Sequence, residues 1–283
     1  MKTKKTSVKF INDKGIDENT YLWRYIDTHK FLSFILNKSL FFTRLDKFED
    51  QKEGTRISHL FYQNCIKALE NDPEINKMVG GVSVEVNGGM MNKIDEKINQ
   101  IQKSNFANCW FMANDYSESV AMWNLYSSPN SVAIKIKYSD FKNIISEKGL
   151  LSYYEDIEVV CSPIKYVDFI SPKIKGTKLP DSIFIKDISF QHEKEFRIIL
   201  KKEFKKIPPI DYHPSIHRKK SEKNHAGLHD KTGIELDFID FEKFPYELIF
   251  HPKSPEWVKN NINKILETTN THLKTHKSIL ELN

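Results

Sequence analysis

The chain has 283 residues, of which 39% are hydrophobic and 29% charged, proportions typical of a folded globular protein and not of a disordered one. Its 19 phenylalanines supply apolar volume for a core. No run approaches the ~18 consecutive apolar residues of a membrane span. The basic start, MKTKKTSVKF, is not followed by the apolar segment of a secretory signal. We therefore expect a cytoplasmic protein without a membrane partner.

The positive charge is concentrated in one segment. Between 201 and 224 there are eight basic and three acidic residues, so this segment carries the same net charge, +5, as the whole chain. Such a patch attracts phosphate groups. It has few aromatic residues for base stacking, so a solvated loop explains it as well. The residues that would bind nucleic acid are Lys201, Lys202, Lys205, Lys206, Arg218, Lys219 and Lys220.

The first part of the chain predicts a strand, a helix and a second strand in close succession. The segment 21–27 (YLWRYID) is short and rich in aromatic residues, which is typical of a strand. Residues 30–40 place large apolar side chains on one wide helical face, and 40–44 (LFFTR) form the next strand. Four glycines within 78–92 indicate a mobile insert, because they fit neither nucleotide-binding glycine pattern.

The second part predicts further strands and helices in alternation. The segment SVAIKIK, for example, alternates in the way expected of a strand that has one buried and one solvent-exposed face. Strands are expected at 108–112, 131–137, 158–161, 164–169, 195–200, 246–251 and 277–282, and helices at 118–126, 181–190 and 255–267. Residues 1–20 are an N-terminal extension, 21–283 form a single α+β domain, and 201–232 form a basic loop.

The sequence HEKEFRII brings two carboxylates close together. On a strand Glu193, Glu195 and Arg197 would point to the same face, while Phe196 and Ile198 anchor the other face. Such a pair can share catalytic work, one carboxylate binding a sugar hydroxyl and the other taking a proton from an acceptor. The alternative is a structural ion pair of Glu195 with Arg197 or a nearby lysine.

Two arginines near the N-terminus are candidate anion ligands. Arg24 lies within an aromatic strand, where a cation is unusual unless it faces a cleft or an acidic partner. Its planar fork suits a phosphate or a carboxylate. Arg44, with Thr43 beside it, ends the second strand and is a similar case. An acidic partner inside the fold would explain either arginine equally well.

The segment 118–126 carries candidate aromatic ligands. Trp123 and Tyr126 are three residues apart, so they share a helix face on which a nicotinamide or adenine ring could pack. A buried core stripe is the alternative. No metal site is predicted, because four histidines in the basic loop are unevenly spaced and three cysteines lie about fifty residues apart.

Several ordered motifs resemble a known family. LWRYID, FILNKSLFFTRLDKFEDQKEG, CWFMANDYSESVAMWNLYS, SVAIKI, IKYVDF and EKEFRIIL appear in the order seen in the mostly bacterial domain of unknown function 2971. The resemblance covers the chain from about Tyr21 to its end. That family has no settled activity, so the resemblance implies no reaction.

A more distant resemblance is to the ADP-ribosyltransferases. Arg24, Leu40, Trp123 with Tyr126, and Glu195 occur in the order of that family's motifs, and Glu193 would complete its ExE form. Ser131 is the nearest match to the family's middle-strand serine. The resemblance implies a mixed, split central sheet, NAD as substrate and no metal.

The sequence therefore favours NAD-dependent ADP-ribosyl transfer, or NAD hydrolysis, in a toxin or phage-defence setting. Glu195 and Glu193 would be catalytic, and the remaining candidates would bind NAD: Arg24, Thr43, Arg44, Trp123, Tyr126 and Ser131. A non-enzymatic nucleic-acid-binding module that uses the basic loop is the first alternative. A metal-dependent nuclease built on Asp46, Glu49, Asp50 and Glu53 is the second.

Overall fold

The architecture was obtained from a computed structural model. The structure describes residues 4–50, 54, 96, 98–115, 117–147, 149–152, 157–169, 179–202, 231–271 and 273–281. The expected insert at 78–92 lies outside the described residues, and so does most of the basic loop.

The described chain forms strands and helices at or near most of the predicted positions. The strands are β1 (Lys4–Lys5), β2 (Ser7–Phe10), β3 (Thr20–Ile26), β4 (Ser39–Arg44), β5 (Asn105–Asn114), β6 (Val132–Lys137), β7 (Leu150–Ser152), β8 (Ile157–Pro163), β9 (Lys165–Val167), β10 (Ile185–Asp187), β11 (Glu195–Lys202), β12 (Gly233–Phe238), β13 (Glu247–Phe250) and β14 (Lys274–His276). The α-helices are α1 (Thr28–Asn37), α5 (Val120–Tyr126), α6 (Tyr138–Glu147) and α8 (Glu256–Thr268), and the short 3₁₀ helices are η1 (Leu45–Lys47), η2 (Leu179–Phe184), η3 (Ile188–Glu193) and η5 (Phe241–Lys243).

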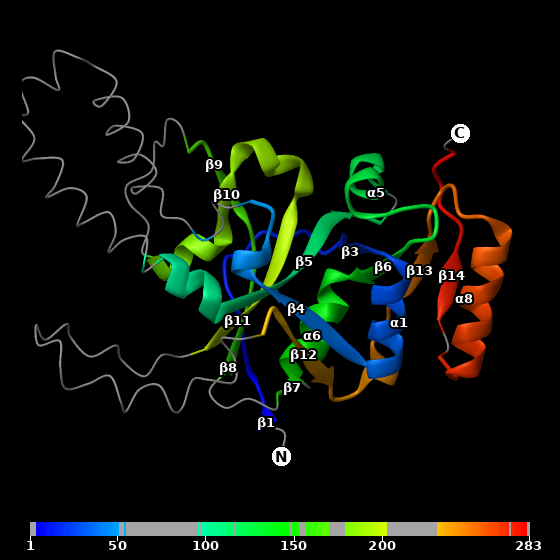
Figure 1. The fold of residues 1–283 in the computed structure, drawn as a ribbon, viewed down its shortest axis with the longest axis horizontal. Coiled ribbons are helices and arrows are strands. Elements are labelled where there is room, and N and C mark those ends of the chain that lie inside the picture. Colours follow the sequence, from blue (N-terminus) through cyan, green and yellow to red (C-terminus); the bar gives the residue numbers. More distant parts are fainter. Residues whose placement is uncertain are drawn as a thin grey trace, which may run out of the picture.

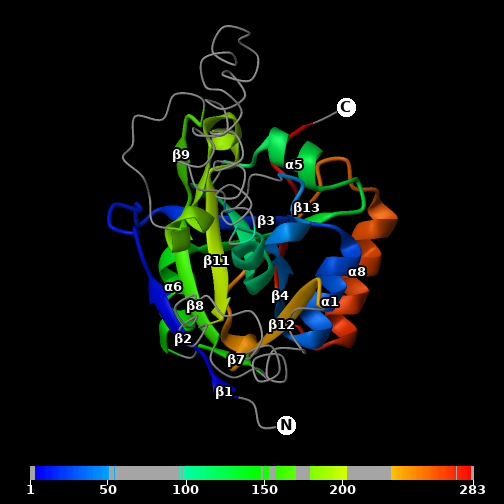
Figure 2. The same ribbon diagram turned by 60° about the vertical axis from the view of Figure 1, so that its left-hand side comes forward.

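One large sheet contains all of these strands except β9 and β10, which form a separate two-stranded sheet. Its pairs are antiparallel except β2 with β8 and β13 with β14, so the sheet is mixed. In Figures 1 and 2, α1 and α8 lie toward one end of this sheet and β8 toward the other. The predicted single α+β domain with a mixed sheet is confirmed. Within the described residues no helix is long and apolar enough to cross a membrane.

The sheet divides at β5. One edge of β5 pairs with β11 over residues 105–111. Its other edge is shared: Phe106 and Ala107 pair with β4, whereas residues 111–114 pair with β3. Residues 108–110 pair with neither β3 nor β4, so the sheet opens there.

The core packs mainly on one face of the sheet. Leu22 and Ile26 of β3 point into it, with Phe31 and Phe34 of α1. Trp23 and Tyr25 alternate to the opposite face, where they join a smaller cluster with Trp123. The alternation of β3 follows from strand geometry, and it leaves Arg24 on the face of the main core.

The N-terminal extension is part of the sheet. β1 pairs with β7, and β2 pairs in parallel with β8. The Lys142 ammonium and the Tyr138 hydroxyl donate hydrogen bonds to Asp13, which ties the chain between β2 and β3 to α6. Residues 4–20 therefore contribute to the domain itself.

Two local predictions were wrong. The helix expected at 181–190 is instead η2, β10 and η3, because β10 pairs with β9 and Asp187 caps η3 through the Ser189 N–H. The last strand lies at Lys274–His276 and not at 277–282. The helix expected from about Glu118 to Tyr126 is present as α5, which begins after Ser119, whose hydroxyl accepts from the Met122 N–H.

Candidate functional site

A cavity of about 820 Å³ lies where the sheet opens. Strands β3, β4, β5, β11 and β12, helices α1 and α5, and the segment 186–193 all contribute to its walls. Its size is within the range of small-molecule sites. The residues on which the site is built are Arg24, Phe41, Thr43, Asn108, Trp110, Tyr126, Lys186, Glu193, Glu195, Arg197 and Glu235.

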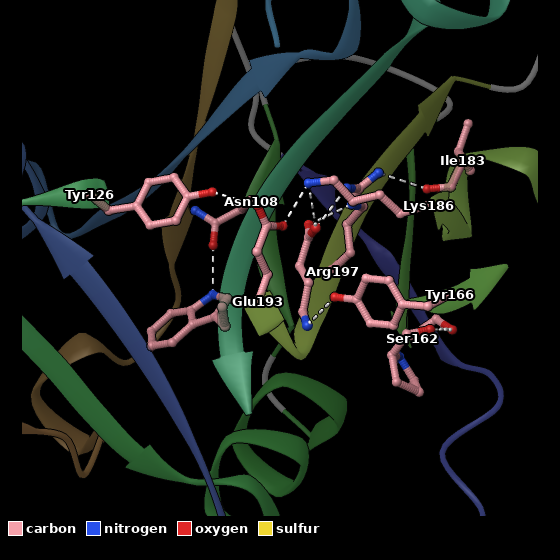
Figure 3. A network of polar contacts seen from close by, with 11 residues as sticks. Asn108, Tyr126, Ser162, Tyr166, Ile183, Lys186, Glu193 and Arg197 are labelled. Atoms are coloured by element: carbon pink, nitrogen blue, oxygen red, sulfur yellow. Dashed lines mark hydrogen bonds and ion pairs between the residues drawn. The ribbon is translucent and has the colours of Figure 1, made fainter. Parts of the chain in front are cut away.

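Glu193 is held at the cavity wall by two donors. The Tyr126 hydroxyl donates to Oε1 at 2.7 Å, and the Lys186 ammonium donates to Oε2 at 2.6 Å. Figure 3 shows the carboxylate between these two side chains. Burial and the hydrogen bond to Glu193 raise the pKa of Tyr126, so its hydroxyl keeps its proton. Tyr126 therefore fixes the orientation of Glu193 from α5.

Glu195 forms a buried, two-point ion pair with Arg197. The Arg197 Nε and one terminal nitrogen donate to the two carboxylate oxygens at 2.7 and 2.8 Å, and the other terminal nitrogen donates to the Ile183 carbonyl at 2.9 Å. The Glu195 N–H donates to the Tyr166 hydroxyl at 2.8 Å. Arg197 is fully buried. The ion pair considered as an alternative from the sequence is thus present.

The Glu195 carboxylate is ionised in this environment. Burial by itself raises the pKa of Glu195, but the charge and hydrogen bonds of Arg197 and the charge of Lys186 outweigh it, so the pKa lies below its ordinary value. Lys186 lies 3.8 Å from Glu195 as well as 2.6 Å from Glu193. The two carboxylates are therefore balanced by two cations.

The local chain path differs from the predicted strand. Glu193 ends η3, and Lys194 adopts a left-handed backbone conformation with φ of 38°. Glu195 begins β11, so only Glu195 and Arg197 are related by strand alternation. The expectation that all three side chains share one strand face was wrong for Glu193, although the turn still brings its carboxylate next to Lys186.

Arg24 is a cation in the cavity lining that has no ion-pair partner among the described residues. Among the described residues its guanidinium has neither a carboxylate partner nor a hydrogen bond, and it lies 5.9 Å from the centroid of the Trp110 ring. Burial lowers the pKa of Arg24 to about 10, which leaves it charged at neutral pH. A half-buried guanidinium of this kind is suited to an anionic ligand.

Asn108 joins the two halves of the opened sheet, and the sequence prediction missed it. Its amide donates to the Phe41 carbonyl of β4 at 2.8 Å, and its oxygen accepts from the Trp110 Nε1 at 2.6 Å. The side chain is 1% exposed. Asn108 thus fixes the indole over which Arg24 lies. Its only signal in the sequence was a polar residue at the start of an apolar strand.

Of the other four candidate ligands, one lines the cavity and three do not. Thr43 lines the cavity. Arg44 lies outside its lining and forms an ion pair with Asp46 at 2.5 Å. Trp123 is fully buried: its Nε1 donates to Glu118 at 3.1 Å, and its ring packs edge-on against Tyr25. It lies behind the cavity rather than in its lining.

Ser131 stabilises the turn before β6 and does not line the cavity. It is fully buried, its hydroxyl accepts from the Ser128 N–H at 2.9 Å, and it precedes β6. Of the proposed nucleic-acid ligands, Lys201 lies over the Phe184 ring and Lys202 ends β11. The others, Lys205, Lys206, Arg218, Lys219 and Lys220, lie outside the described residues.

The acidic turn behind the nuclease hypothesis does not form a metal cluster in the described structure. Asp46 is paired with Arg44, Glu49 and Asp50 line the cavity, and Glu53 lies outside the described residues. In the part of the chain that is described, no group of three acidic, histidine or cysteine side chains could hold a metal ion.

Comparison with known proteins gives no relative. No family model, no curated protein and no solved structure matches the chain significantly. The function has to be argued from the cavity itself.

Proposed function

We propose that the cavity binds NAD and that the protein cleaves the bond between nicotinamide and ribose, transferring ADP-ribose to an acceptor or to water in a toxin or phage-defence setting. One observation carries this proposal. An arginine with no partner among the described residues, Arg24, lines the same cavity as two buried carboxylates, Glu193 and Glu195. Those are the groups that a diphosphate and a developing ribosyl cation require.

The diphosphate would bind to Arg24. Its guanidinium can donate two hydrogen bonds to neighbouring phosphate oxygens. Trp110 lies against it and leaves fewer waters to compete. The cost of burying an unpaired cation would then be offset only when the anion is present.

Glu195 would stabilise the positive charge that develops on the ribose. Because its pKa is lowered, its carboxylate is ionised throughout the neutral range. Arg197 holds both oxygens in one orientation, which lessens the cost of reorganising them in the transition state. The electron pair of the broken C–N bond leaves with nicotinamide and neutralises its ring.

Glu193 would receive the proton of the acceptor. An acceptor hydroxyl or a water attacks the ribose carbon, forms the new C–O bond and passes its proton to the Glu193 carboxylate, from which solvent removes it. Tyr126 orients that carboxylate. The fold would be a variant of the ADP-ribosyltransferase fold, and the opening of the sheet at β5 supports that relationship.

A second candidate is nucleotide binding without chemistry. The observation that favours it is the Glu195–Arg197 pair, since both carboxylate oxygens already accept hydrogen bonds. An ion pair of this kind can be purely structural, and removing one member of a buried pair costs about 3–5 kcal/mol.

Release of nicotinamide from NAD separates the two candidates. The wild-type protein should release it, with or without nucleic acid present, and Glu195→Gln should lower the rate by several orders of magnitude. Because that change leaves Arg197 unpaired, the double variant E195Q/R197M, which removes both charges, is measured as well. Glu247→Gln is the control, since Glu247 is ion-paired with Lys135 at 2.8 Å outside the cavity. Binding of NAD without any release by the wild type would leave only the second candidate.

A further inference from the structure

The wall of the cavity formed by α1, β4 and β12 has features that neither carboxylate chemistry nor phosphate binding uses. Phe41 of β4 and Glu235 of β12 are direct cross-strand partners, so their side chains share one face of the sheet. Both line the cavity, together with Ser33 of α1. This wall is defined here as the Phe41–Glu235 wall.

Phe41 is an accessible aromatic side chain in a chain whose other strand aromatics are mostly buried. It is 45% exposed, whereas its neighbour Phe42 is fully buried in the main core. The ring extends over Gly233: a Cβ on that residue would lie 2.1 Å from the Phe41 Cζ. Gly233 thus leaves the space that the ring occupies, and the exposed ring can stack on a planar group.

Glu235 is a carboxylate without a compensating cation in the described ranges. Its Oε1 accepts from the Ser33 hydroxyl and from the Asn37 amide, each at 3.3 Å, and the same amide lies 3.4 Å from Oε2. Both donors are neutral and all three distances are long. The carboxylate can therefore accept further hydrogen bonds, and two adjacent hydroxyl groups are the donors that an acidic residue in a nucleotide site usually binds.

We infer that the Phe41–Glu235 wall binds the adenosine end of the nucleotide, and that Glu235 selects a ribose that carries no phosphate. The base would stack on Phe41, the ribose hydroxyls would donate to Glu235, and the phosphates would lie toward Arg24. A 2′-phosphate would bring a second negative charge against Glu235, which is unfavourable. This inference rests on the proposed function, because it assigns the end of NAD that the reaction does not touch.

Two small ligands that undergo no reaction test whether Glu235 discriminates against a 2′-phosphate. Adenosine 5′-monophosphate and adenosine 2′,5′-bisphosphate differ only by the 2′-phosphate, and isothermal titration calorimetry gives the affinity of each. The wild type should bind the monophosphate at least tenfold more tightly. Glu235→Gln should reduce that ratio by about tenfold, mainly by improving binding of the bisphosphate. Glu242→Gln is the matched control, because Glu242 pairs with Lys38 outside the cavity.

The aromatic contact is tested in the same titrations. Phe41→Ala should weaken binding of the monophosphate by about tenfold, as loss of one stacking partner does. Gly233→Ala should also weaken binding of the monophosphate, since the added methyl displaces the Phe41 ring. Leu36→Ala, an exposed apolar residue of α1 outside the cavity lining, should change nothing.

The results separate this inference from the proposed function. An unchanged affinity ratio in Glu235→Gln, or unchanged monophosphate binding in Phe41→Ala, overturns the inference, while release of nicotinamide by the wild type would still support the reaction. The expected changes in both variants, without any release of nicotinamide, would support the inference and leave the reaction unsupported.

Discussion

The guanidinium of Arg24 lies 5.9 Å from the centroid of the Trp110 ring, and Asn108 fixes that ring by accepting a hydrogen bond from its Nε1. The three residues come from the two strands, β3 and β5, that separate where the sheet opens. The position of Arg24 therefore depends on the side chain that bridges β5 to β4.

Asn108 should be important for both stability and binding. Asn108→Leu keeps a similar volume but leaves the Phe41 carbonyl and the Trp110 Nε1 without their partner, at a cost of about 1–3 kcal/mol for each buried group left unsatisfied. Urea unfolding measures this loss. Asn114→Ala, an exposed change at the end of the same strand, should leave the unfolding midpoint unaltered. Equal midpoints for both variants would show that the bridge contributes nothing.

Tyr126 and Glu193 should affect transfer more than hydrolysis. Tyr126→Phe removes only the hydroxyl that donates to Glu193 at 2.7 Å, so the carboxylate stays but is less well oriented. We expect both Tyr126→Phe and Glu193→Gln to lower transfer to an acceptor by tenfold or more, with a smaller effect on NAD hydrolysis. Product analysis that separates ADP-ribose from the modified acceptor checks this. A proportional loss of both products would contradict the role of Glu193 in handling the acceptor.

The Glu195–Arg197 pair should make the stability of the protein depend on pH in the acid range. The folded-state pKa of Glu195 lies below its ordinary value of 4.5, so the stability that the pair provides is present above that value and is lost as the pH falls through the lower, folded-state pKa. The melting temperature of the wild type should therefore fall more steeply on acidification than that of E195Q/R197M. An equal fall in melting temperature for the wild type and E195Q/R197M across this pH range would show that the pair is not ionised as described.

The sequence was sufficient for the elements that depend on local pattern. The aromatic run of β3 and the alternation in β11 predicted those strands, and a charged residue inside an aromatic strand singled out Arg24. Trp123 was a poorer prediction, because a tryptophan on a short helix can face either the core or the cavity. The contacts with Glu118 and Tyr25 that decide this are not local.

The rest of the site depends on pairing between distant segments. Lys186 fell within a predicted helix, yet it lies on β10, whose pairing with β9 directs its ammonium toward Glu193. Glu235 follows the basic segment and meets Phe41 only because β12 pairs with β4. Neither the opening of the sheet nor the bridge at Asn108 can be read from a single strand.

The most direct test is the affinity of ADP-ribose for the wild type and for Arg24→Met, measured by calorimetry alongside the melting temperature. Arg24→Met should weaken binding by about 10- to 100-fold, because hydrogen bonds to a charged group are lost. It should not lower the melting temperature, since it removes a half-buried cation that has no partner among the described residues. Arg44→Gln should do the opposite, lowering stability through its lost pair with Asp46 while leaving binding intact. Unchanged affinity in Arg24→Met would contradict the assignment of this cavity as a nucleotide site.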